Sequence, residues 1–279
     1  MRKARTIAWY TLAILLAFIL PSFAPPAEII TVKGSDTMVI LAQRWAEVYM
    51  RTHHDVSIQV TGDGSGTGIF ALINGLTDIC NSSRKMTKAE IAMLKERYSS
   101  LGVEIPCARD GITIYLNLSN PVEELTLKQL SDIFAGRIAN WKDVGGNSAP
   151  INLYGRETNS GTYYVFKDEV VKTDFSRSCQ SLPGTLAIVN AVIRDDNGIG
   201  YGGAAFANGV KRCKIKVDDN SPGYIATEET MEQNLYPMAR DLYMYTRNRP
   251  TGAVKKFIDW VLSPEGQKEV IATVYFPLK

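Results

Sequence analysis

The sequence predicts an α/β fold with mainly parallel sheets. Short apolar segments with the composition of strands alternate along the chain with stretches whose apolar residues recur at helical spacing. Three of the strand-to-helix junctions are rich in Gly, Ser and Thr. The 279 residues suffice for two ordinary domains or one large one, with a sizeable buried core.

The elements follow one another in a regular order. We expect strands at residues 29–32, 56–60, 78–81, 112–118, 151–154 and 241–246. The helices between and after them are expected at 38–49, 69–73, 88–98, up to 134 after an N-cap at Thr126, from 163 onward, and at 253–262 before Ser263-Pro264. The sequence shows no internal repeat and no low-complexity stretch.

The composition excludes two broad classes of protein. Lys and Arg number 31 against 29 Asp and Glu, so there is no basic excess to neutralise the phosphates of a nucleic acid. Hydrophobic residues make up 45% of the chain, with 13 Tyr, nine Phe and four Trp, which excludes wholesale disorder.

The first 27 residues are predicted to be a signal peptide. Arg2, Lys3 and Arg5 precede an apolar run at 7–20, and Ala24 and Ala27 offer two cleavage positions. A membrane anchor is the alternative, but the apolar run would span only about 21 Å of a roughly 30 Å hydrocarbon core. No cysteine lies near the cleavage positions, so lipoprotein processing is not expected. We therefore expect export to the periplasm and an approximately neutral mature protein.

The cysteines are expected to form structural disulfides, because export places them in an oxidising compartment. Sequence order favours Cys80–Cys107 and Cys179–Cys213, although four cysteines allow three pairings. None has CxxC spacing, and the only two histidines are the adjacent His53 and His54, so we expect no metal site.

Three loops carry the strongest functional signal. At Ser35–Thr37, Ser65–Gly68 and Ser160–Thr162 a Gly/Ser/Thr segment follows a predicted strand and opens a helix. Such turns direct backbone N–H groups, a hydroxyl and the positive end of the helix dipole outward, whereas glycine allows close approach of a ligand. A single loop of this kind is ordinarily just a helix cap. Three of them predict an anion site.

Three charged residues follow strands near these loops. Arg84 and Arg156 could each hold an oxyanion with a guanidinium, although solvated surface arginines are the simpler interpretation. Asp110 is unexpected beside an anion, unless the anion carries a proton that the carboxylate accepts. The alternative is an ordinary Asp-Gly turn.

Enzyme motifs are not found. The segment 198–203 formally fits GxGxxG but lacks the preceding strand of a dinucleotide site. The chain has no GxxxxGK[ST] loop and no GxSxG elbow, and neither histidine lies in a loop positioned to serve a serine. We expect a binding protein without a cofactor rather than an enzyme.

In the same order, these loops resemble those of the periplasmic phosphate-binding proteins (PstS-like). The similarity covers nearly all of residues 29–279, and it includes a characteristic middle segment with Asn120-Pro121-Val122, Leu125-Thr126, Gln129-Leu130, Ile133-Phe134-Ala135-Gly136 and Asn140-Trp141.

The resemblance implies a two-lobed, hinged periplasmic-binding-protein fold of type 2, each lobe a mainly parallel sheet flanked by helices. It implies lobe one at 28–112 plus 241–279, lobe two at 113–240, and crossings near 111–116 and 238–243. It also implies a monomer that captures inorganic phosphate in the inter-lobe cleft and delivers it to the permease of an inner-membrane ABC transporter. Alternatives are the same fold binding another oxyanion or acting as a phosphate sensor and, more distantly, a secreted hydrolase using Ser65 or Ser160.

Carried over by motif, the resemblance assigns roles to ten residues. Hydroxyl and backbone N–H contacts are expected from two loops of lobe one, positive charge from two arginines, acceptance of the phosphate proton by a carboxylate, and closure from lobe two. The residues are Ser35, Thr37, Ser65 and Gly66, then Arg84 and Arg156, then Asp110, then Ser160, Gly161 and Thr162.

Overall fold

The computed structural model describes residues 28–278, so the predicted signal peptide lies outside the described residues. The strands are β1 (Glu28–Gly34), β2 (Val56–Gly62), β3 (Ile79–Ser82), β4 (Val103–Leu116), β5 (Glu124–Thr126), β6 (Asn152–Arg156), β7 (Gln180–Leu182), β8 (Gly198–Gly203), β9 (Lys211–Lys216) and β10 (Ala239–Thr246).

Helices follow most of these strands. The α-helices are α2 (Val39–Met50), α3 (Ser65–Ile73), α4 (Lys88–Tyr98), α5 (Leu127–Phe134), α6 (Gly161–Phe166), α7 (Gly184–Ile193), α8 (Glu228–Glu232), α9 (Gly252–Leu262) and α10 (Pro264–Ala272). Short helical segments of other types are η1 (Asp36–Met38), η2 (Trp141–Val144), η3 (Lys167–Val171) and η4 (Ala204–Phe206).

The sheet follows the order β2-β1-β3-β10-β4-β8-β6-β7, with β9 paired to both β4 and β5. The pairs β1–β2, β1–β3, β5–β9, β6–β7 and β6–β8 are parallel. The antiparallel pairs of this sheet all involve β4 or β10. The predicted α/β fold with parallel sheets is therefore confirmed, and the antiparallel pairing is confined to two long strands.

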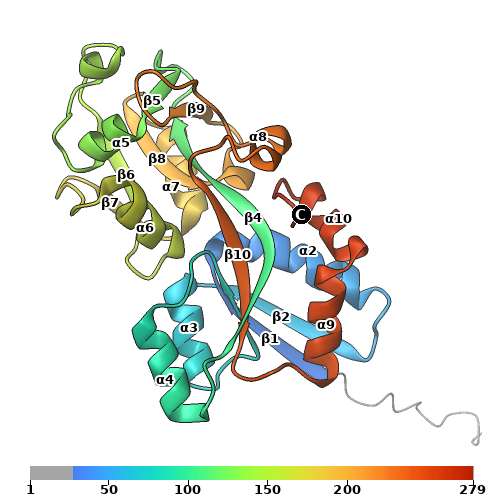
Figure 1. The fold of residues 1–279 in the computed structure, drawn as a ribbon. Coiled ribbons are helices and arrows are strands. Elements are labelled where there is room, and N and C mark those ends of the chain that lie inside the picture. Colours follow the sequence, from blue (N-terminus) through green and yellow to red (C-terminus); the bar gives the residue numbers. More distant parts are fainter. Residues whose placement is uncertain (1–27, 279) are drawn as a thin grey trace, which may run out of the picture.

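These two strands run side by side through the molecule. Figure 1 shows β4 and β10 connecting the part built on β1 and β2 to the part built on β6, β7 and β8. Each part has its own hydrophobic cluster. Trp45 and Phe257 belong to the cluster beside β1, whereas Phe134, Trp141 and Tyr201 belong to the cluster beside β8. Two separately packed bodies are thus joined by extended backbone.

Strand β8 is buried along its whole length and was not predicted from the sequence. Its Gly-Ile-Gly-Tyr-Gly-Gly sequence does not resemble a strand, because glycine is depleted in strands. The packing explains the glycines: a Cβ on Gly200 would lie 2.3 Å from Cγ2 of Ile188, and one on Gly202 would lie 2.4 Å from Cγ2 of Thr185. Helix α7 lies directly on this strand.

The predicted disulfides are wrong: Cys80, Cys107, Cys179 and Cys213 are all free thiols. Cys80 lies on β3 and Cys107 on β4, and β10 is inserted between those strands. Two inter-strand spacings amount to about 9.6 Å, beyond the 4.4–6.8 Å between Cα atoms that a disulfide requires. The two thiols also belong to different hydrophobic clusters.

The second pairing fails for a similar reason. Cys213 pairs with Ile114 from one side, while β8 pairs with the other side of Ile114. Cys179 precedes β7, at the far edge beyond β8 and β6. Sequence order could not show this, because the strands are not arranged in sequence order.

Two further structural observations concern residues 28–278 alone. No helix in this range is both long and apolar enough to cross a membrane. Over the same range, no group of three or more His, Cys, Asp or Glu side chains is placed to hold a metal ion.

Candidate anion-binding site

The three Gly/Ser/Thr loops meet at one place. The loops after β1 and β6 touch through Thr37 and Thr162, whose hydroxyl oxygens lie 2.9 Å apart. The loop after β2 lies beside them, because a Cβ on Gly161 would lie 2.4 Å from Oγ of Ser65 and 2.6 Å from Oγ of Ser83. All of these side chains are buried. The structure therefore gathers hydroxyls from separate strand ends, as the sequence predicted.

An aspartate and an arginine lie at the centre of these hydroxyls. Asp110 of β4 and Arg240 of β10 are register partners, and Nη2 of Arg240 donates to Oδ2 of Asp110 at 2.8 Å. The same nitrogen donates to Oγ1 of Thr162 at 3.0 Å, while Nη1 donates to the carbonyl of Ser83 at 3.2 Å. The ion pair thus contacts hydroxyl-bearing loops on both sides.

Asp110 is completely buried and retains capacity to accept hydrogen bonds. Oδ2 receives both bonds from Arg240, whereas Oδ1 receives one bond, from the backbone N–H of Ala204 at 3.2 Å. Burial raises the pKa of Asp110, and Arg240 and the Ala204 N–H oppose that rise. A carboxylate with a raised pKa is a stronger proton acceptor than an exposed one.

Arg156 lies at the end of β6 and is also buried. Its Nη1 donates to Oδ2 of Asp36 at 3.1 Å and to Oγ1 of Thr185 at 2.7 Å, and the N–H of Thr185 donates to the same Asp36 oxygen at 2.7 Å. Burial lowers the pKa of Arg156, with Asp36 opposing this shift. Nε of Arg156 and Oδ1 of Asn81 are the buried side-chain atoms in residues 28–278 that lack a hydrogen-bond partner. An unsatisfied buried donor is costly, so a ligand atom at Nε would be favourable.

The remaining candidates after β1 and β2 have backbone N–H groups that already donate to carbonyls of other segments. Ser35 is buried between β1 and η1, and its backbone N–H donates to the carbonyl of Asn81 at 2.8 Å. The N–H of Gly66 donates to the carbonyl of Asn159 at 2.8 Å. That bond ties the loop after β2 to the loop after β6, so this amide already has a partner.

Ser160 is the N-cap of α6 and accepts a bond from the N–H of Tyr163 at 3.3 Å. Asn159 beside it donates to the carbonyl of Asp63 at 2.8 Å and to Oγ1 of Thr67 at 3.1 Å. The loops after β2 and β6 are therefore joined by several bonds.

Comparison with known proteins identifies the family of this chain. Residues 21–265 match the PBP superfamily domain. The phosphate-binding protein PstS of Pseudomonas aeruginosa is 33% identical over 263 residues, covering 88% of this chain and 81% of that protein. PstS of Staphylococcus epidermidis is 32% identical over 249 residues, covering 84% of this chain and 74% of that protein.

The chain belongs to the PstS-like proteins of the PBP superfamily. Solved structures agree with this membership. A Clostridium perfringens structure with bound phosphate, assigned to a phosphate ABC transporter substrate-binding protein, has a TM-score of 0.83 at 30% identity and covers 90% of this chain and 100% of that chain. An ABC-type phosphate transport receptor from Vibrio cholerae has a TM-score of 0.71 at 25% identity, covering 89% and 100%.

In this PstS-like protein, the buried ion pair and the surrounding hydroxyls form a central cluster that consists of Asp110, Arg240, Thr37, Ser65, Ser83 and Thr162. Arg84 does not lie in this cluster. Its Nη1 and Nη2 donate to the carboxylate of Glu90 at 2.8 and 2.7 Å, and Nη1 also donates to the carbonyl of Lys85 at 2.9 Å. The hydrogen-bond donors of the Arg84 guanidinium are thus used by Lys85 and by the first turn of α4. The position of Arg84 after a strand did not reveal this.

Arg240, the cation paired with Asp110, was not predicted from the sequence. One signal was available: Asp110 directly precedes the predicted crossing at 111–116, Arg240 lies within the predicted crossing at 238–243, and opposite charges favour cross-strand pairing. The register Arg240↔Asp110 required the structure. Ser83, whose N–H donates to Oγ of Ser65 at 3.0 Å, was also missed.

Proposed function

We propose that this chain is an exported solute-binding protein that binds inorganic phosphate and passes it to the permease of an ABC importer. The observation that carries the proposal is the fully buried Asp110, held by Arg240 among hydroxyls from separate strand ends. The chain's PstS relatives are named for phosphate binding, and a structural neighbour contains bound phosphate.

The donors and acceptors of the site suit a protonated oxyanion. Hydroxyls of Thr37, Ser65 and Thr162, together with the guanidinium groups of Arg240 and Arg156, can donate to ligand oxygens. Asp110 can accept a proton that phosphate carries at neutral pH and sulfate lacks. Against sulfate, the same carboxylate would be a buried repulsion. We infer that Asp110 provides selectivity and the donors provide affinity.

The free energies of these hydrogen bonds are sufficient for tight binding of phosphate. Hydrogen bonds to charged groups contribute roughly 1.5–3 kcal/mol each. Micromolar affinity requires only about 8 kcal/mol net. Several such bonds therefore leave a margin for dehydrating the anion and for closing the cleft.

We propose that the site lies between two lobes, at 28–112 plus 241–279 and at 113–240. Support comes from the two separate hydrophobic clusters and from β4 and β10, which run through both parts. Thr37, Ser65 and Ser83 would then face Ser160, Gly161 and Thr162 across the cleft. Bending of β4 and β10 would open it.

We also infer that the mature protein is a monomer, that it has no catalytic activity, and that residues 1–27 direct export to the periplasm. Hydroxyls lie near Asp110, but the histidines lie at 53 and 54, directly after α2. A Ser–His pair for hydrolysis is therefore not formed by them.

Calorimetric titration of the exported, ligand-stripped protein with phosphate and then sulfate at pH 7 tests the function. We expect tight one-to-one binding of phosphate and no heat with sulfate. A preference for sulfate would indicate another oxyanion as the ligand, and binding of neither would contradict the proposal. Mass spectrometry of the same preparation would distinguish cleavage after Ala24 from cleavage after Ala27.

A further inference from the structure

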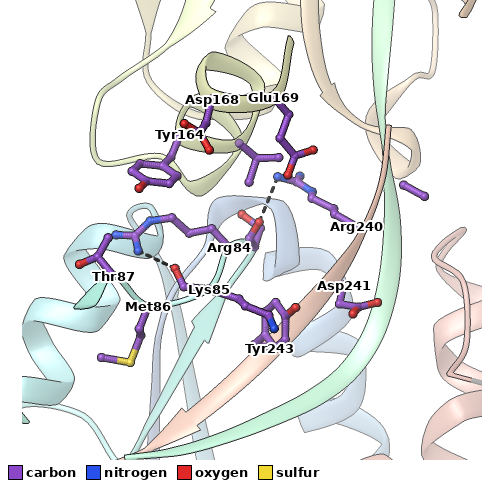
Figure 2. Close-up of a pocket in the computed structure, with 13 residues that line it drawn as sticks. Arg84, Lys85, Met86, Thr87, Tyr164, Asp168, Glu169, Arg240, Asp241 and Tyr243 are labelled. Atoms are coloured by element: carbon purple, nitrogen blue, oxygen red, sulfur yellow. Dashed lines mark hydrogen bonds between the residues drawn. The ribbon is translucent and has the colours of Figure 1, made fainter. Parts of the chain in front are cut away.

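A cavity of about 350 Å³ adjoins the central cluster and shares Ser83 and Arg240 with it. Figure 2 shows that the residues after β3 line one side of this cavity, whereas Tyr164, Asp168 and Glu169 line the opposite side. On the proposed lobe boundaries, these two sides belong to different lobes. The cavity thus lies at the mouth of the proposed cleft.

One contact spans this mouth. Cζ of Arg84 lies 5.1 Å from the ring centroid of Tyr164, which is the geometry of a cation–π interaction. Arg84 is 9% exposed, whereas Tyr164 is 45% exposed at the protein surface. The arginine is therefore covered by a ring that belongs to the other side of the cleft.

The guanidinium of Arg84 is held in place by contacts other than the one with Tyr164. The carboxylate of Glu90 accepts hydrogen bonds from both terminal nitrogens of Arg84. The same carboxylate accepts a bond from the N–H of Thr87 at 2.7 Å, as part of the capping box of α4. Because the edge of the guanidinium is taken, its flat face remains for Tyr164. The Glu90 carboxylate also neutralises the charge locally, so Arg84 contributes little attraction for a distant anion.

Both partners are close in sequence to the central cluster. Arg84 directly follows Ser83, and Tyr164 is two residues after Thr162 on the single short helix α6. Movement of α6 away from the proposed first lobe would separate Thr162 from Thr37 and Tyr164 from Arg84 together. The contact between Arg84 and the Tyr164 ring therefore depends on the same closed arrangement as the central cluster.

We propose that Arg84 and Tyr164 are positioning residues that hold the cleft closed and set the rate of phosphate release without contacting the anion. This inference rests on the proposed function and the proposed lobes. It assigns Arg84 a role different from the ligand role implied by the family resemblance. It requires phosphate selectivity to be independent of both residues.

Stopped-flow measurement of phosphate binding, followed by intrinsic fluorescence, tests this inference. For Tyr164→Leu we expect release to be roughly threefold to tenfold faster, with the association rate and the phosphate-to-sulfate ratio unchanged. Tyr164→Phe retains the ring and should release phosphate at the wild-type rate. Arg84→Gln should match Tyr164→Leu, and the double variant should be no faster than either single variant.

Arg97→Gln is a matched control, because Cζ of Arg97 lies 6.0 Å from the ring centroid of Tyr98, on α4 and outside the cavity lining. It should leave release unchanged. If Arg84→Gln proves unstable, the Tyr164 variants decide the question alone.

Two results would overturn the inference: wild-type release rates in Tyr164→Leu, or a change in the phosphate-to-sulfate ratio in Arg84→Gln or Tyr164→Leu. Absence of phosphate binding by the unsubstituted protein would instead overturn the proposed function. The calorimetric titration with phosphate detects that outcome separately.

Discussion

Two arginine–carboxylate pairs lie close to Ser83, and they have similar N–O distances but different surroundings. Arg240 and Asp110 approach to 2.8 Å, and Arg84 and Glu90 to 2.7 Å. The first pair joins neighbouring strands and is surrounded by hydroxyls, whereas the second closes a seven-residue segment at a helix start. An ion-pair distance alone therefore does not identify a binding site; the surrounding donors do.

The pKa values of the two carboxyl groups shift in opposite directions. Burial raises the pKa of Asp110 and dominates there. Burial also acts to raise the pKa of Glu90, but the hydrogen bonds from Arg84 and Thr87 outweigh it, so the pKa of Glu90 is lowered. Glu90 is a satisfied structural carboxylate, whereas Asp110 is suited to accept a proton.

The largest expected effect is on Asp110. Asp110→Asn should lower the phosphate-to-sulfate affinity ratio by roughly 100-fold, because removal of a buried negative charge relieves a repulsion of several kcal/mol against sulfate. Competitive calorimetric titration measures the ratio. Glu90→Gln makes the same chemical change in the other pair and should leave the ratio intact. Unchanged selectivity in Asp110→Asn would exclude the proton-acceptor role.

Acidification should act on the same group. As pH falls through the raised pKa of Asp110, its carboxyl becomes protonated and can donate to sulfate. Sulfate affinity should therefore rise with falling pH in the wild type and stay flat in Asp110→Asn. Titrations at a series of pH values distinguish these cases. A parallel rise in both proteins would assign the effect to another group.

The next largest effect is expected at Gly161, where the proposed lobes meet. A Cβ would lie 2.4 Å from Oγ of Ser65, so Gly161→Ala should hold the loops apart. We expect phosphate affinity to fall about 10- to 100-fold, with little change in the melting temperature of the ligand-free protein. Thr158→Ala, at an exposed position on the same loop, should change neither value. Wild-type affinity in Gly161→Ala would show that these loops do not close on each other in the bound state.

A smaller effect on stability is expected from Glu90→Gln. Loss of its hydrogen bonds to Arg84 should cost about 1–2 kcal/mol at pH 7. Because the folded-state pKa of Glu90 is lowered, its stabilisation is present above the ordinary value of 4.5 and is lost as pH falls through the folded-state pKa. Denaturant unfolding between pH 3 and pH 7 should show a difference between wild type and variant that shrinks toward low pH. A difference that is constant with pH would contradict this assignment.

No effect is expected from reduction. A structural disulfide typically contributes about 2–4 kcal/mol, and the four cysteines are unpaired. Thermal melts with and without dithiothreitol should therefore coincide for the exported protein. Alkylation of the unfolded, unreduced protein should modify four thiols. A lower melting temperature under reduction would restore the disulfide prediction.

Part of this molecule could be predicted from local sequence patterns. The spacing of apolar residues placed a helix at 38–49, and α2 is Val39–Met50; Thr126 was expected as an N-cap and forms a capping box with Gln129. The three Gly/Ser/Thr loops were found because each needs only a strand end, a helix start and small polar residues. These are properties of a few consecutive residues, so the sequence alone determines them.

Tertiary structure decided what depends on strand order and register. The strands β3 and β4 are separated by β10, which comes late in the chain, so Cys80 and Cys107 are kept apart. The same insertion brings Arg240 opposite Asp110, whereas Arg84 forms its ion pair with Glu90. The pairing of Arg240 with Asp110 joins residues 130 positions apart, and no local pattern encodes such a contact.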